Sequence, residues 1–366
     1  MGKFFFKSFL TVLLLVVTTI IFLSYFGVET DKFDGLIKTK VNEVNKYAKL
    51  DFKKTKIHLN FTELNLVVRL QDPKILIKDN KIILSRLDLF LALKSFFTSN
   101  FLLERAEVAF VKNDIRDLTK ITNIFLPKII KKKLEKIFNK GDLEGEFIIP
   151  FESDGNIGKG YSFSGKISDS TINLTKEFSI KNLTTKINHL RTDNGDAFEV
   201  AIKSGFLKNI DLSESTINLE HNENGTQTKN LLRTKGKLNS AQIGQIFKLF
   251  NLKTPDFKGI NGNIDLNTSI NFDLSKKFKV KNLNYTIEGD IFHLEIHSKE
   301  RKIIREYLPE YDSKIIFKDV KIKILNSKQR QSGEITGFIK VKDDFDNFKI
   351  KENFNYKDKI FDINGI

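Results

Sequence analysis

The sequence predicts a mainly β protein, in which an N-terminal transmembrane helix precedes an elongated, repetitive sheet of antiparallel type with a few short amphipathic helices. Three observations predict this class. Residues 8–28 carry no charge, later side chains alternate between apolar and polar, and several strand-like segments recur with nearly the same sequence. A period of two is typical of strands with one apolar face and one wetter face.

The uncharged N-terminal run is long enough to cross a bilayer, because about 20 apolar residues in a helix match the hydrocarbon thickness. A cleaved secretory signal has a shorter apolar stretch and small residues at its cleavage site, whereas Tyr25, Phe26 and Val28 are bulky. We therefore expect residues 1–28 to be a retained anchor with a cytoplasmic stub. Lysines before the run and acids after it place the N-terminus in the cytoplasm and the bulk of the chain in an exported compartment.

Composition narrows the class further. The 366 residues include no cysteine, which excludes disulfides, zinc-thiolate sites and thiol nucleophiles. The formal net charge is +15, from 61 basic and 46 acidic side chains. Such a balance favours an anionic membrane surface or lipid head groups. Nucleic acid is disfavoured as a partner, because the basic residues face an exported compartment without a stacking or helix-turn-helix signature.

The exported part divides into three regions by pattern. Residues 29–117 alternate as strands, residues 118–140 have the spacing of an amphipathic basic helix, and residues 141–366 are almost wholly strand-like. The helix has two interpretations, one as a helix near anionic lipid and one as an ordinary capping helix with a solvated basic face, which is the commoner case. Its membrane-facing candidates are Lys128, Lys131, Lys132, Lys133 and Lys136.

The last region repeats itself. Residues 178–187 recur as residues 278–287, and residues 170–174 recur as residues 215–219. Strands that open on glycine are also expected repeatedly, and short helices are expected at residues 240–250 and 299–308. Such self-similarity indicates a stacked array of strands, because no single row buries its apolar face alone. The glycines concerned are Gly145, Gly236, Gly289 and Gly337.

Catalytic motifs are not found. The one suggestive cluster is His293, Glu295 and His297, which would share one face of a strand. Two residues four apart on a strand lie about 13 Å from each other, which is too far for both to bind the same ion. This trio is therefore interpreted as part of the solvent-exposed polar face of an amphipathic strand. The sequence has no nucleophile elbow, no phosphate-binding glycine loop and no H-E-x-x-H motif. We therefore expect a protein that is not an enzyme and uses no cofactor or metal.

The order of features resembles a known family. An anchor precedes strand-like residues 64–72, 82–89 and 101–111, and residues 125–145 carry a leucine-proline, short helix and glycine-strand passage. This arrangement resembles the AsmA-like proteins of the YhdP and TamB type, which are anchored in the inner membrane and extend into the periplasm. The resemblance implies a curved sheet that forms an open trough, whose apolar groove carries phospholipid toward the outer membrane.

Larger members of that family continue much further, so the chain is expected to be a fragment or a short member. An open C-terminal edge strand would suit a distal protein partner. Alternation along the strands offers candidate lining residues for a lipid groove, although a packed core gives the same pattern. The candidates are Leu87, Leu89, Leu91, Leu93, Ile172, Leu174, Ile217, Leu219, Ile264 and Leu266.

Three other functions stay open from the sequence. One is a structural scaffold or assembly factor for outer-membrane proteins that pairs through its edge strands. Another is a component of a lipopolysaccharide bridge, which the expected internal helices disfavour. The third is an exported hydrolase, which the missing nucleophile disfavours.

Overall fold

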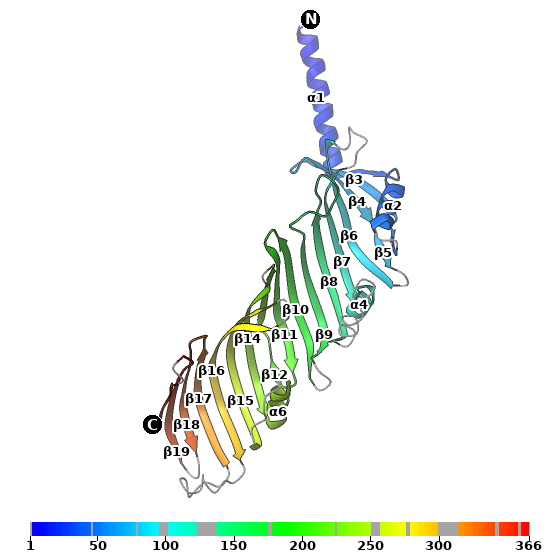
Figure 1. The fold of residues 1–366 in the computed structure, drawn as a ribbon. Coiled ribbons are helices and arrows are strands. Elements are labelled where there is room, and N and C mark those ends of the chain that lie inside the picture. The colour runs from blue at the N-terminus through cyan, green and yellow to red at the C-terminus, as the bar shows by residue number, and fades with distance from the viewer. Residues whose placement is uncertain are drawn as a thin grey trace. The chain divides into compact units, whose positions relative to one another are not determined.

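The computed structural model describes residues 2–44, 47–77, 80–94, 102–122, 137–174, 178–223, 225–249, 257–275, 279–298, 314–340, 344–357 and 360–365. It confirms a mainly β protein with few helices and an apolar N-terminal helix (Figure 1). The helices are α1 (Gly2–Tyr25), α2 (Asp34–Val44), α4 (Ile115–Thr122) and α6 (Ser240–Leu249). The strands are β1 (Val28–Thr30), β2 (Ala48–Asp51), β3 (Lys54–Asn60), β4 (Asn65–Gln71), β5 (Lys74–Ile77), β6 (Asn80–Ala92), β7 (Leu103–Asp114), β8 (Phe138–Pro150), β9 (Ser162–Asn173), β10 (Ser179–Thr192), β11 (Gly195–Leu207), β12 (Ile210–Asp211), β13 (Thr216–Asn222), β14 (Gly225–Asn239), β15 (Phe257–Leu274), β16 (Val280–Ser298), β17 (Lys314–Asn326), β18 (Arg330–Lys340), β19 (Phe345–Asn355) and β20 (Ile360–Gly365).

The chain forms two compact units, which are treated separately below. The N-terminal unit comprises Met1–Glu135, Asp142–Lys166 and Asn188–Asp193. The C-terminal unit comprises Lys136–Gly141, Ile167–Ile187 and Asn194–Ile366.

Helix α1 is long and apolar enough to cross a membrane over Phe6–Tyr25. It ends at Tyr25, and Gly27 follows with a φ of 66° that reverses the chain into β1, a conformation that a side chain at this position would oppose. A Cβ atom at Gly27 would also lie 2.6 Å from the carbonyl oxygen of Ile57, on the strand that pairs with β1. The expected anchor is therefore shorter than residues 8–28 at its C-terminal end, because Val28 already belongs to a sheet.

The N-terminal unit buries one face of an antiparallel sheet under helix α2 (Figure 1). Val68 and Leu70 on β4 pack with Leu87 and Leu91 on β6, and Ile37 from α2 belongs to the same core. Helix α2 is fixed to the sheet where Thr55 donates a 2.5 Å hydrogen bond to Asp34 at the start of the helix. Alternation on β4 and β6 therefore places one set of side chains in a closed core and the other set on the opposite face.

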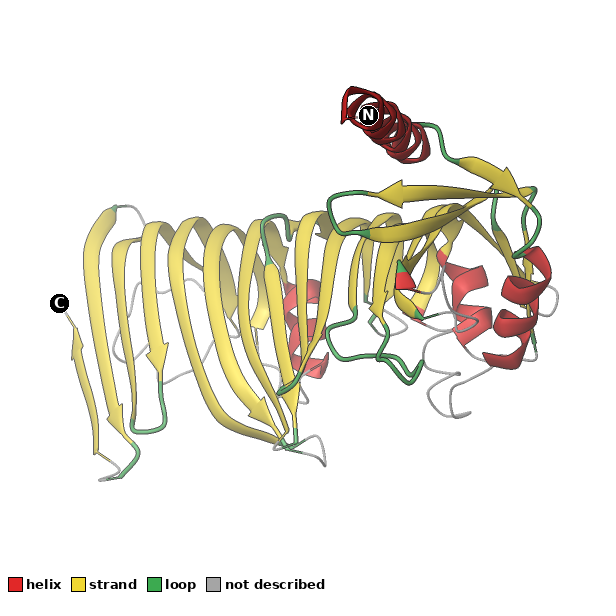
Figure 2. Cartoon of the chain, turned by 90° about the horizontal axis from the view of Figure 1, so that it is seen from above, coloured by secondary structure: helices red, strands yellow, loops and turns green. Residues whose placement is uncertain are grey.

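The C-terminal unit is a succession of long antiparallel strands in which neighbours in sequence pair from β13 to β20. Figure 2 shows the strands next to the C-terminus side by side in a single layer. Helix α6 follows β14 and contacts β14 and β15. Its start is capped by Asn239, whose side chain accepts from the backbone of Gln242 while the Gln242 side chain accepts from the backbone of Asn239.

The repeated glycines lie inside strands rather than at their beginnings, which corrects the expectation from the sequence. Gly236 and Gly289 have φ values of 144° and 152°. A Cβ atom at Gly236 would lie 2.1 Å from the carbonyl oxygen of Asn209, just before β12, and one at Gly289 would lie 2.2 Å from the carbonyl oxygen of Asp265 on β15. The repeats also share a backbone irregularity, because Asn182 and Asn282 both adopt positive φ. Asparagine tolerates this conformation better than most residues.

The helix expected at residues 118–140 is shorter in the structure. Helix α4 covers its beginning, and β8 already starts at Phe138, so residues 138–140 belong to a strand. The lysines expected to face a membrane lie outside the described residues, as does the helix expected at residues 299–308. Those lysines are Lys128, Lys131, Lys132, Lys133 and Lys136.

Candidate functional site

One face of the C-terminal unit carries apolar side chains on eight strands, and it contains four of the residues that the sequence predicts for a lipid groove. Ile217 and Leu219 on β13 lie opposite Asn230 and Thr228 on β14. Those β14 residues in turn lie opposite Ile270 and Phe272 on β15. Residues directly opposite each other point to the same side of a sheet, so β13 and β15 share this face. Ile264 and Leu266 have the parity of Ile270 and therefore lie on it too.

The same face continues toward the C-terminus as rows of facing aliphatic side chains. Ile287 on β16 lies opposite Ile324 on β17. In the next row, Ile322 lies opposite Ile335 on β18, which lies opposite Ile350 on β19. We call this surface the apolar face; its members are Val200, Ile217, Leu219, Leu232, Ile264, Leu266, Ile270, Phe272, Ile287, Ile322, Ile324, Ile335 and Ile350.

The opposite face of the same strands is polar and laced with ion pairs. Glu288 and Lys323, the neighbours in sequence of Ile287 and Ile324, face each other across β16 and β17. Two-sided alternation of this kind makes the sheet amphipathic over its whole width. The ion pairs join Lys323 to Glu288 at 2.7 Å, Lys349 to Glu334 at 2.9 Å and Lys235 to Asp265 at 3.1 Å.

The apolar face is unevenly covered among the described residues, and Ile264 is its buried member at 7% exposed. Ile287, Ile322 and Ile324 are half-buried, and Ile350 is 41% exposed. Within the elements that the structure describes, β17 and β18 contact mainly their neighbours in the sheet, so no second layer packs on them there. Exposed apolar surfaces of this kind are candidate binding sites.

The remaining predicted lining residues lie in other environments. Leu87 and Leu91 are 7% and 8% exposed and belong to the core under α2, and Leu89 packs against that core. We therefore leave these three out of the apolar face. Leu93 lies half-buried in the turn after β6, Ile172 is half-buried on β9, and Leu174 is 47% exposed just beyond β9.

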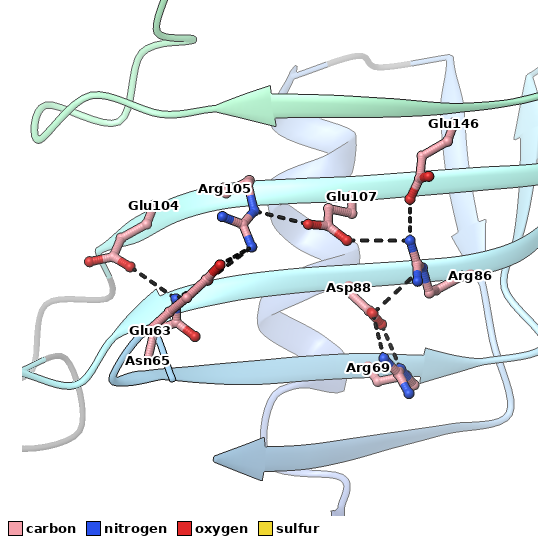
Figure 3. A network of polar contacts seen from close by, with 9 residues as sticks. All are labelled: Glu63, Asn65, Arg69, Arg86, Asp88, Glu104, Arg105, Glu107 and Glu146. Carbon is pink, nitrogen blue, oxygen red and sulfur yellow. Dashed lines mark hydrogen bonds and ion pairs between the residues drawn. The ribbon is translucent and has the colours of Figure 1, made fainter. Parts of the chain in front are cut away.

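A network of ionised side chains occupies the face of the N-terminal sheet opposite its core (Figure 3). Arg69 on β4 donates two hydrogen bonds to Asp88 on β6, of 2.8 Å from Nε and 2.7 Å from Nη2. Arg86 pairs with Glu107 at 3.3 Å and with Glu146 on β8. The network exists because the strand register sets Arg69, Asp88 and Glu107 directly opposite one another.

Arg105 completes the network at one end. It pairs with Glu107 and Glu63, both at 3.0 Å, and its guanidinium stacks on Phe90 at 4.0 Å from the ring centroid. The hydrogen bonds from Arg105 and Asn65 hold the pKa of Glu63 below its usual range. Sequence reasoning missed this cluster, although the signal was present: charges of both signs occupy the parity that the leucines of the same strands leave free.

A pocket of about 900 Å³ lies between this network and helix α1. Its apolar wall comes from Val17, Ile20 and Ile21 on α1. Its polar floor comes from the three arginines with Asp88 and Glu107, and Phe61 from the turn after β3 lines its edge. The pocket is therefore amphipathic, with hydrocarbon on one side and guanidinium groups on the other.

His58 also lines this pocket, and its titration makes the stability of the folded chain depend on pH. Burial lowers the pKa of His58 below its ordinary value of 6.5, and the charges of Arg69 and Lys56 lower it further. Well above pH 6.5 the imidazole ring is neutral in both the folded and the unfolded chain, so it does not change the free energy of unfolding. As pH falls below that value the unfolded chain binds a proton that the folded ring resists, so stability is lost.

We therefore expect a smaller acid loss in His58→Gln. Between about pH 7.5 and pH 5, the thermal unfolding midpoint should fall further in the wild type than in the variant. An equal fall in both proteins would show that His58 does not carry the effect.

The cluster at His293, Glu295 and His297 forms on β16 without meeting metal-site geometry. His297 lies 2.5 Å from Glu295, which also pairs with Lys314 at 3.3 Å, whereas His293 lies 4.0 Å away. The hydrogen bond from His297 and the contact with Lys314 lower the pKa of Glu295. Across the described residues no group of three metal-ligating side chains is close enough to hold an ion.

No protein-family model, no curated protein and no solved structure matches the chain.

Proposed function

We propose that this chain is a membrane-anchored lipid-binding protein whose apolar face holds the acyl chains of phospholipid. It would sit in the inner membrane as a single-pass protein with a cytoplasmic N-terminus. From there it would contribute to phospholipid transport to the outer membrane, or to the assembly of that membrane. The observation that carries the proposal is the apolar face itself, which extends from β11 to β19 and leaves most of its aliphatic side chains partly exposed.

The chemistry of that face supports hydrocarbon as its occupant. Its side chains are aliphatic or aromatic, so they offer dispersion contacts and gain free energy as water leaves. The opposite face of the same strands carries ion pairs and suits an aqueous compartment. The helix α1 supports a membrane as the source of the lipid, because it is long and apolar enough to span one.

The test is phospholipid retained by the full chain after purification in a mild detergent. We expect the wild type to carry phospholipid, and Ile324→Glu to lose it several-fold, because a carboxylate on the apolar face is poorly solvated beside acyl chains. Extracted lipid measured by mass spectrometry gives the amount for each protein.

Leu325→Glu is the matched control, because Leu325 is the next residue of β17 and lies on the polar face, where it is 38% exposed. It should retain as much lipid as the wild type. Circular dichroism checks that both variants keep their sheet. A wild-type chain without phospholipid would contradict the proposal and favour the alternative of a structural scaffold for outer-membrane proteins.

A further inference from the structure

We propose that the pocket between α1 and the arginine network binds the phosphodiester headgroup of a membrane phospholipid. The inference rests on the proposed function, because it names the place where lipid would leave the membrane. It concerns the N-terminal unit alone and depends on contacts other than those of the apolar face.

The first observation is unused hydrogen-bonding capacity. Arg69 donates hydrogen bonds from Nε and Nη2, whereas Arg86 and Arg105 donate them from Nη2 and use Nε only in ion pairs. Within the part of the chain that the structure describes, no hydrogen bond joins the Nη1 nitrogen of any of these arginines to a protein acceptor. Each Nη1 carries two N–H donors, and guanidinium donors match phosphate oxygens in geometry and charge.

The second observation is charge. The ionised groups that line the pocket are three arginines and two acids, Asp88 and Glu107. Glu63 and Glu146 satisfy Arg105 and Arg86 but do not line the pocket. Among the groups that a ligand meets, guanidinium groups outnumber carboxylates by three to two, but Glu63 and Glu146 bring the carboxylates paired with these arginines to four, so the N–H donors and not a net positive charge favour a phosphate oxygen. The guanidinium donors on this floor therefore match an anionic oxygen of a ligand by hydrogen bonding.

The third observation is that the anion must belong to an amphiphile. The wall opposite the arginines consists of Val17, Ile20 and Ile21, from the C-terminal half of the helix that can cross a membrane. Phe61 at the edge of the pocket is 62% exposed. A soluble phosphate would leave this apolar wall in contact with water. A phospholipid would place its phosphate on the floor and its acyl chains along α1.

Contacts within the protein also preorganise the arginine side chains for such a ligand. Asp88 is nearly fully buried and fixes Arg69 through two bonds, and the ring of Phe90 fixes the plane of Arg105. Binding then costs little side-chain entropy, because the donors are already oriented.

The test uses the full chain in nanodiscs of phosphatidylcholine with labelled phosphatidylglycerol as the minor lipid. A photo-crosslinking amino acid replaces Phe61, so that the readout comes from the edge of the pocket. Arg105→Gln should reduce crosslinking to the labelled lipid about tenfold, since a hydrogen bond to a charged group contributes that factor or more. This variant is chosen because its partners keep other contacts: Glu107 keeps Arg86, and Glu63 is accessible to water.

A second variant, Ile21→Trp, fills the pocket from the helix without touching an ion pair and should reduce crosslinking to a similar extent. Arg116→Gln is the control, because Arg116 forms an exposed ion pair with Asp114 outside the pocket. It should leave crosslinking unchanged. The same crosslinking in all four proteins would overturn the inference, because it would report ordinary bilayer lipid around Phe61.

A competition experiment distinguishes a lipid phosphate from a soluble phosphate ester. Excess glycerol 3-phosphate should leave crosslinking nearly unchanged, and its complete loss would overturn the lipid as occupant in favour of a soluble phosphate ester. The two proposals fail separately. If lipid retention depends on Ile324 while crosslinking ignores Arg105, only the headgroup pocket is wrong. If crosslinking depends on Arg105 while lipid retention ignores Ile324, only the apolar face is wrong.

Discussion

Replacing Arg69 with alanine is expected to lower the free energy of unfolding by about 3 kcal/mol. The side chain of Asp88 is 2% exposed, and Arg69 supplies both of its hydrogen bonds. In the variant only Arg86 remains near, with its Nε at 3.7 Å, so a buried carboxylate would be left poorly paired. Because the side chain of Arg69 is itself half exposed, the expected loss of free energy of unfolding is at the lower end of the range measured when one partner of a buried ion pair is removed. Urea unfolding of the detergent-solubilised chain, followed by circular dichroism, measures it.

The double variant Arg69→Met with Asp88→Leu is the informative companion. It removes the charge together with its partner, and it should recover most of the stability that the single variant loses, because no carboxylate then stays buried. Arg116→Ala, at the exposed ion pair with Asp114, should change stability by less than about 1 kcal/mol. A single variant as stable as the wild type would mean that the carboxylate of Asp88 does not depend on Arg69 for its stabilisation.

Replacing Gly289 with alanine is expected to destabilise the C-terminal unit by about 3 kcal/mol or more. Gly289 lies inside β16 with φ of 152°, where a Cβ atom would lie 2.2 Å from the carbonyl oxygen of Asp265 and 2.9 Å from the Cα atom of Leu266. Both atoms belong to the backbone of β15, so neither can move without breaking strand pairing. Urea unfolding and the rate of proteolysis both report the loss.

Gly333→Ala on β18 is the control for this substitution. Its φ lies outside the range that favours glycine, and the nearest atom to an added Cβ is the Cβ of Glu352 at 3.9 Å. The same substitution at Gly333 should therefore lower the free energy of unfolding by less than about 1 kcal/mol. It should be neutral or stabilising if the smaller conformational entropy of the unfolded chain outweighs any contact with Glu352. Equal losses at both positions would mean that glycine matters for strand flexibility in general and not for the close approach at Gly289.

Two leucine and isoleucine sets with the same sequence pattern have different surroundings in the structure. Leu87 and Leu91 on β6 are closed into a core, because α2 covers that face and adds Ile37. Ile287 and Ile324 stay half-buried, because within the described residues their strands pair only with other strands. The pattern fixes which side chains share a face, and the presence of a covering element decides whether that face is core or surface.

The alternation of apolar and polar side chains and the uncharged N-terminal run were sufficient to predict a β-rich chain with an apolar N-terminal helix, since both depend on local spacing alone. They also identified Ile217, Leu219, Ile264 and Leu266, which register then placed on one face. Tertiary structure alone decided the arginine network, because Arg69, Asp88 and Glu107 lie on three strands and meet only through their pairing. It alone also decided that the repeated glycines sit within strands, since the approach of a neighbouring carbonyl leaves no mark in the sequence beyond the glycine itself.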